Sequence, residues 1–400
     1  MILVINESGK APENISSCNR ALAAEISNNF VQIWQPAPDA ERGFGIRLYR
    51  DEHSPRDVLL VDRFSEGCSL PSRGGVGHAR KIGVDLAASL VHRKYVHSPW
   101  VHCTDGDVRL PETYFTIAND MQKNGPGHSA LIYPFFHRNG QADLEQSEVE
   151  LATQLYELSL RYYVAGLRLA GSPYAFHTIG STMAVRASHY AKVRGFPRRA
   201  AGEDFYLLNK LAKVGPVLEL EAGTDCEPLE IESRRSDRVP FGTGAAVNKI
   251  TALSNSVQDF RFYDPVVFGL LKQWLQAWPE IWRSGSADLE ADVFANQADD
   301  SSSRDGFDWL KAGLISIGTE KALAHAFRQS GDLDQFKRQM RTWFDAFRTL
   351  KLIHFLRDQY VCSVSYAELE ARPEFRQLLK RDTELRDFHD QLKQLMQTVK

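Results

Sequence analysis

The sequence predicts an α/β protein in which a mostly parallel sheet is flanked by helices and followed by an α-helical appendage. Up to about residue 250, short apolar runs of strand length alternate with helix-like stretches, as in βαβ units. Beyond about residue 255, the pattern changes to helices only, with apolar residues three or four positions apart. We therefore expect a catalytic-type α/β domain at 1–250 and a helical region at 255–400.

The expected strands are short apolar runs of the length that buried strands have. In chain order they lie at 2–5, 58–62, 100–103, 130–136 and 182–186. The segment 30–35 (FVQIWQ) is a poor candidate for a further strand. Because helices separate most of these runs, neighbouring strands are expected to run parallel.

The expected helices follow from apolar periodicity and from residues typical of helix ends. In the first part they span 12–26, 79–90, 111–123, 143–170 and 203–213, and in the second 264–283, 307–328, 332–358 and 366–398. Pro12 and Glu13 suit a first helical turn, and Gly171 with Pro173 closes the long helix. The acidic, serine-rich stretch 285–306 predicts a mobile loop.

Composition excludes several classes of protein. With 43% hydrophobic and 25% charged residues, the 400-residue chain is an ordinary globular mixture, which argues against a disordered or fibrous protein. The balance of 48 basic against 51 acidic residues gives no global reason to expect nucleic-acid binding. Five cysteines without a CxxC pair favour a reducing compartment. Since we find neither a targeting segment nor a long apolar run, we expect a soluble cytoplasmic protein.

The tripeptide Asp105-Gly106-Asp107 directly follows an expected strand. Two carboxylates separated by a glycine can converge on one hard cation, and Mg²⁺ typically takes one or two protein carboxylates together with water and phosphate oxygens. Ligands of open α/β sheets bind at the carboxyl ends of strands, which is where this turn is expected. The alternative is an ordinary acidic turn between a strand and a helix. If the tripeptide is considered alone, this alternative is the favoured interpretation.

A glycine-rich loop at 74–83 (GGVGHARKIG) leads into an expected helix. Glycines permit close backbone approach, a helix N-terminus attracts anions, and Arg80 adds donors suited to phosphate. The spacing matches neither GxxxxGK[ST] nor GxGxxG, so it is not an ordinary NTPase or dinucleotide fingerprint. A flexible turn with a basic helix start is the alternative.

Glu203 and Asp204 open an expected helix. Adjacent acids at a helix N-terminus are stabilised by the helix dipole, which is a sufficient structural explanation. A carboxylate at this position could also act as a general base toward an acceptor hydroxyl. In isolation, the pair favours the structural explanation.

Together, the three motifs resemble glycosyltransferase family 2. In that family the loop reads approximately G-x-x-x-A-R-N-x-G, the metal motif is D-x-D, and a late E-D pair is followed by an apolar helix. Here they occur as Gly75-Val-Gly-His-Ala-Arg-Lys-Ile-Gly83, Asp105-Gly-Asp107 and Glu203-Asp-Phe-Tyr-Leu-Leu208. Lys81 replaces the usual asparagine. The resemblance covers roughly residues 1–245 and does not extend to 255–400.

The resemblance implies a GT-A fold and a hexosyl-type transfer, with inversion, from a UDP- or GDP-sugar to a hydroxyl acceptor, using Mg²⁺ or Mn²⁺. Asp107 would bind the metal directly, and Asp105 would contact the ribose or the metal through water. Arg80 would hold the nucleotide. Asp204 would deprotonate the acceptor, and Glu203 would orient it.

The resemblance also implies nucleotide contacts at Asn6 and Glu7, which end the first strand. In the family, the second strand normally ends in an aspartate that contacts the base, and the candidate here is Asp62, which could belong to the second or the third strand. Arg238 belongs to a group of arginines beside a glycine-rich loop at 239–244. These arginines could close over the diphosphate, and a solvated charged loop is an equally good interpretation. The acceptor itself, whether a saccharide, a lipid or a small molecule, is not identified by the sequence.

Two alternative functions remain open at this point. A sugar nucleotidyltransferase would also use a metal-bound carboxylate pair, but it would release pyrophosphate and would not need the Glu203–Asp204 pair. A non-catalytic binding or scaffold protein would bind nucleotide sugars without turnover.

Three tryptophans form a stripe on the expected helix 264–283, because Trp274, Trp278 and Trp282 recur every four residues. Burial against the catalytic domain is the favoured interpretation. A membrane-surface helix would usually carry more Lys and Arg on its polar face, and it would point to a lipid acceptor.

Overall fold

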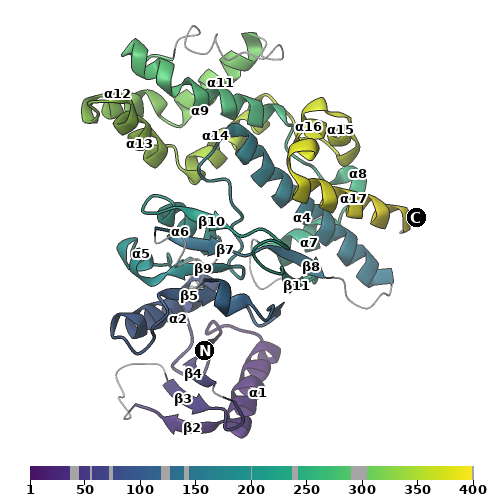
Figure 1. Ribbon diagram of the computed structural model, residues 1–400. Coiled ribbons are helices and arrows are strands. Elements are labelled where there is room, and N and C mark those ends of the chain that lie inside the picture. The colour runs from purple at the N-terminus through teal and green to yellow at the C-terminus, as the bar shows by residue number, and fades with distance from the viewer. Residues whose placement is uncertain are drawn as a thin grey trace. The chain divides into compact units, whose positions relative to one another are not determined.

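The protein is described here from a computed structural model (Figure 1). The structure describes residues 1–36, 45–54, 56–71, 75–118, 127–138, 144–199, 201–236, 242–289 and 304–398. The chain divides into two compact units. The first unit consists of Met1–Phe135, Thr178–Glu230 and Ser236–Ala245, and the second of Phe136–His177, Ile231–Arg235 and Ala246–Lys400. The long helix before residue 177 therefore belongs to the second unit.

The N-terminal sheet has four strands in the order β1-β4-β3-β2. Their bounds are β1 Ile2–Asn6, β2 Val31–Trp34, β3 Gly45–Arg50 and β4 Asp57–Arg63. β1 runs parallel to β4, with Ile2 opposite Leu59, whereas β3 is antiparallel to both of its neighbours. Helix α1 (Glu13–Asn29) lies beside this sheet, as Figure 1 shows.

A second sheet of four strands has the order β10-β7-β9-β5. Its strands are β5 Trp100–Cys103, β7 Ala130–Ile132, β9 Met183–Arg186 and β10 Val217–Glu219. Only β10 and β7 pair in parallel among these strands, and β9 is antiparallel to both β7 and β5. A third sheet orders β6 (Val108–Arg109), β11 (Leu229–Glu232) and β8 (Phe135–Arg138).

The predicted single, mostly parallel sheet of the GT-A fold is wrong, because the chain forms three small mixed sheets. Parallel neighbours need a crossover of about a dozen residues or more. β3 is followed by β4 after only residues 51–56, so these strands can pair only as a hairpin. Tyr133 and Pro134 divide the predicted strand 130–136 into β7 and β8, and proline cannot donate a ladder hydrogen bond.

Several predicted strands occur in the structure, although they do not form the predicted sheet. The predicted strand 100–103 is β5, and 58–62 lies within β4. β3 was not predicted, because its sequence (GIRLYR) has no continuous apolar run. The poor candidate 30–35 contains β2, whose four residues are all exposed. Most of the predicted mobile loop 285–306 lies outside the described residues, and its last residues begin a helix.

Three helices of the first unit carry or support the candidate site. They are α2 (Gly75–His92), α5 (Ala187–Lys192) and α6 (Glu203–Leu211). Helix α2 packs against β1 of the first sheet, against β5 of the second, and against α5 and α6. Residues at the start of α2 are therefore brought close to the chain that follows β5 and to the start of α6.

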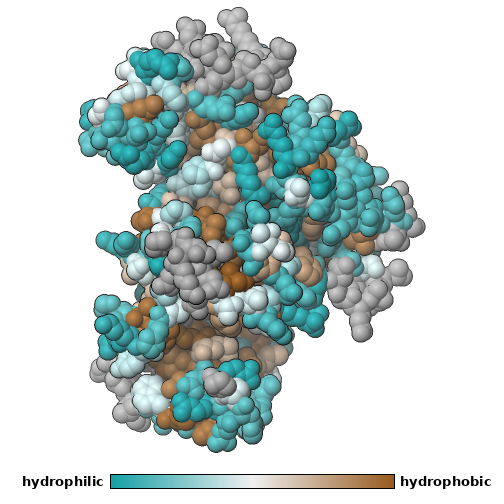
Figure 2. Space-filling model, viewed as in Figure 1, coloured by the Kyte–Doolittle hydropathy of each residue, from teal (hydrophilic) through white to brown (hydrophobic). Residues whose placement is uncertain are grey.

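The second unit is largely helical. Its helices are α4 Leu144–Ala170, α7 Thr243–Thr251 (whose first residues belong to the first unit), α8 Ser256–Asp259, α9 Val266–Ser284, α11 Arg304–Ser316, α12 Thr319–Gln329, α13 Leu333–Trp343, α14 Ala346–Gln359, α15 Tyr366–Ala371, α16 Pro373–Arg381 and α17 Thr383–Thr398. α4 packs against α9 and α17, and α9 also contacts α11, α13 and α14. On the face shown in Figure 2, hydrophilic residues cover most of α15, α16 and α17.

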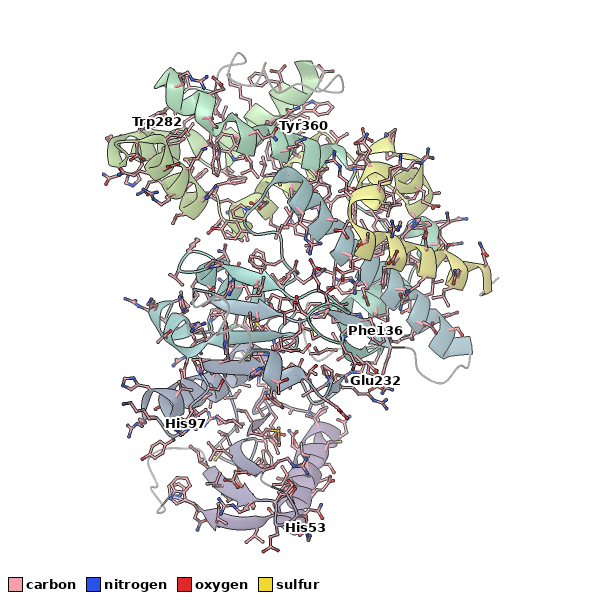
Figure 3. All side chains as sticks on the ribbon, in the orientation of Figure 1. His53, His97, Phe136, Glu232, Trp282 and Tyr360 are labelled. Carbon is pink, nitrogen blue, oxygen red and sulfur yellow. The ribbon has the colours of Figure 1, made fainter. Side chains whose placement is uncertain are left out.

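The tryptophan stripe of α9 is buried among helices of its own unit. Trp274 is completely buried and lies 5.8 Å from the ring of Phe344, and Trp278 is 4% exposed. Trp282, labelled in Figure 3, stacks on Phe327 at 5.7 Å. The predicted burial is thus confirmed, although these partners belong to the helical unit and not to a catalytic domain. Within the described residues, no helix combines the length and apolarity that a membrane crossing requires.

The close approach of α4 and α9 gives a first prediction. A Cβ at Gly166 of α4 would lie 2.6 Å from ring carbons of Phe268 on α9. We expect Gly166→Ala to destabilise the protein by about 1–3 kcal/mol through overpacking, despite the better helix propensity of alanine. The matched control is Gly269→Ala on α9, where the added Cβ meets no atom within 4 Å and should stabilise the helix by up to about 1 kcal/mol. Urea unfolding measures both changes, and equal stabilities would contradict this packing.

Candidate active site

Arg80 of α2 joins the three predicted motifs. Its side chain is 15% exposed, and its Nη2 donates to both carboxylate oxygens of Asp105, at 2.8 and 3.0 Å. Its Nη1 donates to Oε1 of Glu203 at 2.5 Å. Asp105 and Glu203 lie 25 and 123 positions further along the chain. The structure therefore brings these residues together, as the sequence predicts for motifs of one site.

Gly180 makes room for the Arg80 guanidinium. A Cβ at Gly180 would lie 1.8 Å from Nη1 of Arg80, which is far inside the contact distance of real atoms. Any side chain at this position would displace the guanidinium from its carboxylates. The sequence does not mark this glycine as a site residue, because its position in the chain, just before β9, carries no motif.

The acidic pair occupies the first turn of α6. The helix begins after Gly202, whose φ of 70° lies in the left-handed region that glycine adopts readily. The side chain of Glu203 is 3% exposed, and its carboxylate faces Arg80. The carboxylate of Asp204 accepts a hydrogen bond from the backbone N–H of Phe205 at 2.7 Å. Glu203 is thus tied to the cluster, whereas Asp204 lies next to it.

Burial and the neighbouring Glu203 carboxylate raise the pKa of Asp204 to about 6, even though Arg80 and backbone N–H groups oppose the change. Burial alone would lower the pKa of Arg80, but the carboxylates of Asp105, Glu203 and Asp204 raise it, so the guanidinium stays charged. Burial raises the pKa of the Cys103 thiol to about 12, which excludes it as a thiolate nucleophile near neutral pH. Asp204, by contrast, changes its protonation close to neutral pH.

The Asp105-Gly-Asp107 segment forms a turn after β5, closed by a hydrogen bond from the backbone N–H of Val108 to the carbonyl of Asp105 at 3.3 Å. Among the described residues, no group of three or more His, Cys, Asp or Glu side chains could hold a metal ion. Two carboxylates still fit Mg²⁺ or Mn²⁺, because such an ion keeps water and substrate phosphate as further ligands. The cluster also sets three carboxylates against one guanidinium, which favours binding of a cation.

Asn6, Glu7 and Asp62 lie near the carboxyl ends of β1 and β4. The Glu7 carboxylate accepts hydrogen bonds from two side chains of α1, Ser16 at 3.0 Å and Asn19 at 2.9 Å. The buried Asp62 carboxylate accepts from the backbone N–H groups of residues 64 and 65 and from the hydroxyl of residue 65. Both carboxylates thus support local structure, and their contact with a nucleotide stays a prediction. Arg238 lies outside the described residues.

Comparisons with known proteins add no relative: no family model matches the chain, and no curated protein matches it. The resemblance to glycosyltransferase family 2 therefore depends on the three motifs themselves. One residue of each motif takes part in the hydrogen bonds that join them: Arg80, Asp105 and Glu203.

Proposed function

We propose that this protein is an inverting, metal-dependent glycosyltransferase that moves a sugar from a UDP- or GDP-sugar to a hydroxyl acceptor. The supporting observation is the convergence of the glycine-rich loop, the Asp-Gly-Asp turn and the Glu-Asp pair on Arg80. An acidic turn or helix start with a purely local structural role would not require hydrogen bonds from Arg80 to both Asp105 and Glu203, which lie far apart in the chain. The raised pKa of Asp204 adds a general base suited to neutral pH.

In the proposed reaction, Asp204 takes the proton of the acceptor hydroxyl. The acceptor oxygen then forms a bond to the anomeric carbon while the bond from that carbon to the diphosphate oxygen breaks, and the electron pair leaves with the nucleoside diphosphate. Attack opposite to the leaving group inverts the configuration. Glu203 acts as a positioning residue, because its ion pair with Arg80 fixes the start of α6 and hence the place of Asp204.

Asp107, with Asp105, would hold the Mg²⁺ or Mn²⁺ ion. When bound, such an ion neutralises charge that develops on the leaving diphosphate. Asp105 is 46% exposed and already accepts from Arg80, so its oxygens are held in place before substrate arrives. Preorganisation of this kind lowers the cost of ordering the site on binding.

The base assignment predicts the pH dependence of kcat/KM. Asp204 must be ionised to accept a proton, and its pKa is about 6. We expect kcat/KM to rise with pH through about 6 and to level off above it, with a value at pH 5 about tenfold below the plateau. Initial rates across a buffer series measure this limb. A rate that is flat between pH 5 and 8 would exclude Asp204 as the base.

Metal dependence gives a separate prediction. Ligand binding to the native state raises stability, by about 2.7 kcal/mol at a hundred times Kd. In a thermal-shift screen of UDP- and GDP-sugars, we expect Mn²⁺ to increase the donor-induced rise in Tm and EDTA to remove that increase. Asp107→Ala should lose the Mn²⁺-dependent part only. A variant that keeps it, or a wild-type enzyme that works fully in EDTA, would contradict the metal assignment.

The released product tests the proposed reaction itself. We expect incubation with the donor that gives the largest thermal shift, together with candidate acceptors, to release UDP or GDP. Released pyrophosphate would instead indicate a nucleotidyltransferase. Tight donor binding without turnover across saccharide, lipid and small-molecule acceptors would favour a binding protein. Chromatography of the nucleotides detects UDP or GDP, a phosphate assay detects pyrophosphate, and the thermal shift detects donor binding without turnover.

We also propose that the enzyme works in the cytoplasm. The five cysteines, all of them described in the structure, are free thiols, and Cys18 and Cys362 are exposed. Exposed thiols persist most readily in a reducing compartment.

A further inference from the structure

The loop 193–199 follows α5 and leads toward α6, the helix that begins with Glu203 and Asp204. We call it the entry loop. Its turn contains two successive residues in the left-handed region, Arg194 with a φ of 62° and Gly195 with a φ of 66°. This conformation is unfavourable for a residue that has a side chain, so the surrounding structure has to hold Arg194 in it. The entry loop therefore depends on the groups packed around it.

Lys210 of α6 reaches back to this turn. Its Nζ donates to the carbonyl oxygens of Val193 at 2.9 Å and of Gly195 at 2.6 Å. Burial and the positive charge of Lys81 lower the pKa of Lys210. A half-buried ammonium group held by two backbone carbonyls is well placed to fix the course of the chain. Helix α6 thus holds the turn from which the chain approaches its own first residue.

Tyr190 of α5 holds the next residue of the entry loop. Its hydroxyl accepts a hydrogen bond from the backbone N–H of Phe196 at 3.3 Å and donates to the carboxylate of Asp85 on α2 at 2.8 Å. A Cβ at Gly195 would lie 2.5 Å from the Tyr190 ring, so the turn packs against the ring without room for a side chain. The entry loop is therefore fixed to α5 and, through Asp85, to the helix that carries Arg80.

Gly77, in the glycine-rich start of α2, contacts the other end of the entry loop. Its N–H donates to the carbonyl oxygen of Arg199 at 3.2 Å. A Cβ at Gly77 would lie 2.5 Å from that oxygen and 2.9 Å from the Cβ of Glu203. The predicted use of these glycines is close approach to a phosphate. At Gly77, the close approach is to the entry loop and to the first residue of α6.

The position of Asp204 is set by the backbone at the start of α6, because its carboxylate accepts from the N–H of Phe205 on the same helix. Two sets of contacts fix this start. One is the ion pair between Glu203 and Arg80, and the other is the entry loop with its contacts to α2, α5 and α6. The entry loop thus contributes to the place of Asp204 without touching its carboxylate.

We infer that the three residues that fix the entry loop, Lys210, Tyr190 and Gly77, act as positioning residues for the general base. They determine where the carboxylate of Asp204 meets the acceptor hydroxyl. A misplacement of about 1 Å can cost 10²-fold in rate, even when the changed residue lies far from the reacting atoms. That Asp204 acts as a base rests on the proposed function, whereas the fixation of the entry loop does not.

Replacement of Lys210 tests this inference on the full chain. Lys210→Met keeps much of the apolar stem but loses both hydrogen bonds to the turn. We expect kcat to fall by about 10- to 10²-fold, while the donor-induced thermal shift stays unchanged. Lys210→Arg can still donate to both carbonyl oxygens and should keep most of the turnover. The matched control is Lys192→Met, which changes an exposed lysine of α5 and should leave kcat unchanged.

The pKa of Asp204, followed by NMR of its carboxyl carbon, gives a readout that does not depend on activity. Burial is the largest cause of the raised pKa, followed by the charge of Glu203, while Arg80 and two backbone N–H groups oppose them. If Lys210→Met loosens the start of α6, water reaches the carboxylate and the pKa falls from about 6 toward 3.8. A lysine with a purely structural role would lower Tm without moving this pKa.

Tyr190→Phe gives a second variant that tests the inference if Lys210→Met does not fold. It keeps the ring against Gly195 and removes only the hydroxyl group, with its bonds to Phe196 and Asp85. We expect kcat and the pKa of Asp204 to change in the same directions as in Lys210→Met.

An Asp204 pKa that is the same in the wild type and in both variants would overturn the inference. So would sugar transfer that is as fast in Lys210→Met as in the wild type. These outcomes are distinct from failure of the proposed function. A lowered Asp204 pKa in Lys210→Met, in a protein that transfers no sugar, would reject the glycosyltransferase and support the fixation of α6 by the entry loop.

Discussion

Asp204→Asn is expected to lower turnover by about 10²–10⁴-fold while leaving donor affinity almost unchanged. Asparagine keeps the shape of the side chain but cannot accept a proton from the acceptor. Donor binding should persist, because in the proposed mechanism Asp204 acts on the acceptor. Turnover with saturating donor, together with donor-induced thermal shifts, separates the two effects.

The stability of the same variant distinguishes a base from a structural residue. Because the folded-state pKa of about 6 lies above the ordinary value of 3.8, ionised Asp204 lowers stability at neutral pH. Its contribution is most favourable below the unfolded-state pKa and is lost as the pH rises through 6. Asp204→Asn avoids this cost, so its Tm at pH 7 to 8 should equal or exceed that of the wild type, with the difference shrinking in acid.

A purely structural role predicts a different pattern. A first-turn carboxylate that only interacts with the helix dipole is worth about 0.3–1 kcal/mol, and its loss would lower Tm slightly and leave turnover intact. The control is Glu66→Gln, which removes an exposed carboxylate from the same unit. Near-normal turnover of Asp204→Asn would leave only the structural role.

Local patterns predicted elements and motifs better than they predicted the sheets. The strand Trp100–Cys103 can be predicted from a short apolar run, and the buried face of α9 can be predicted from the four-residue spacing of its tryptophans. The structure has this strand, and it buries Trp274. Strand pairing depends on connection length and on partners far along the chain. The hairpin of β3 and β4 follows from the six residues 51–56, but β3 alternates polar and apolar residues without a strong apolar run.

The candidate site shows the same division. Arg80, Asp105 and Glu203 could be nominated because their residue types recur in motifs, and the structure brings them together. Gly180 could not be nominated, because its role arises only from the position of the Arg80 guanidinium.

Arg80→Met should destabilise the protein strongly, by about 3–5 kcal/mol, because it leaves a buried carboxylate without its partner. Glu203 is 3% exposed, and Arg80 supplies its ion pair. Methionine keeps much of the apolar stem of arginine, so lost packing contributes little. The exposed pair Arg50–Asp57, with side chains 57% and 43% exposed, provides the control, since Arg50→Met should change the free energy of unfolding far less than Arg80→Met does.

A double variant identifies the cause of that loss. Glu203→Gln removes the buried charge, so Arg80→Met with Glu203→Gln should recover much of the stability lost in Arg80→Met alone. Arg80 also lowers the pKa of Asp204, and its removal should move the acid limb of any remaining activity above pH 6. A merely structural arginine would not shift that limb. Denaturant unfolding and the pH profile together decide the matter: a loss below 1 kcal/mol with an unmoved limb would show that Arg80 neither neutralises Glu203 nor acts on the base.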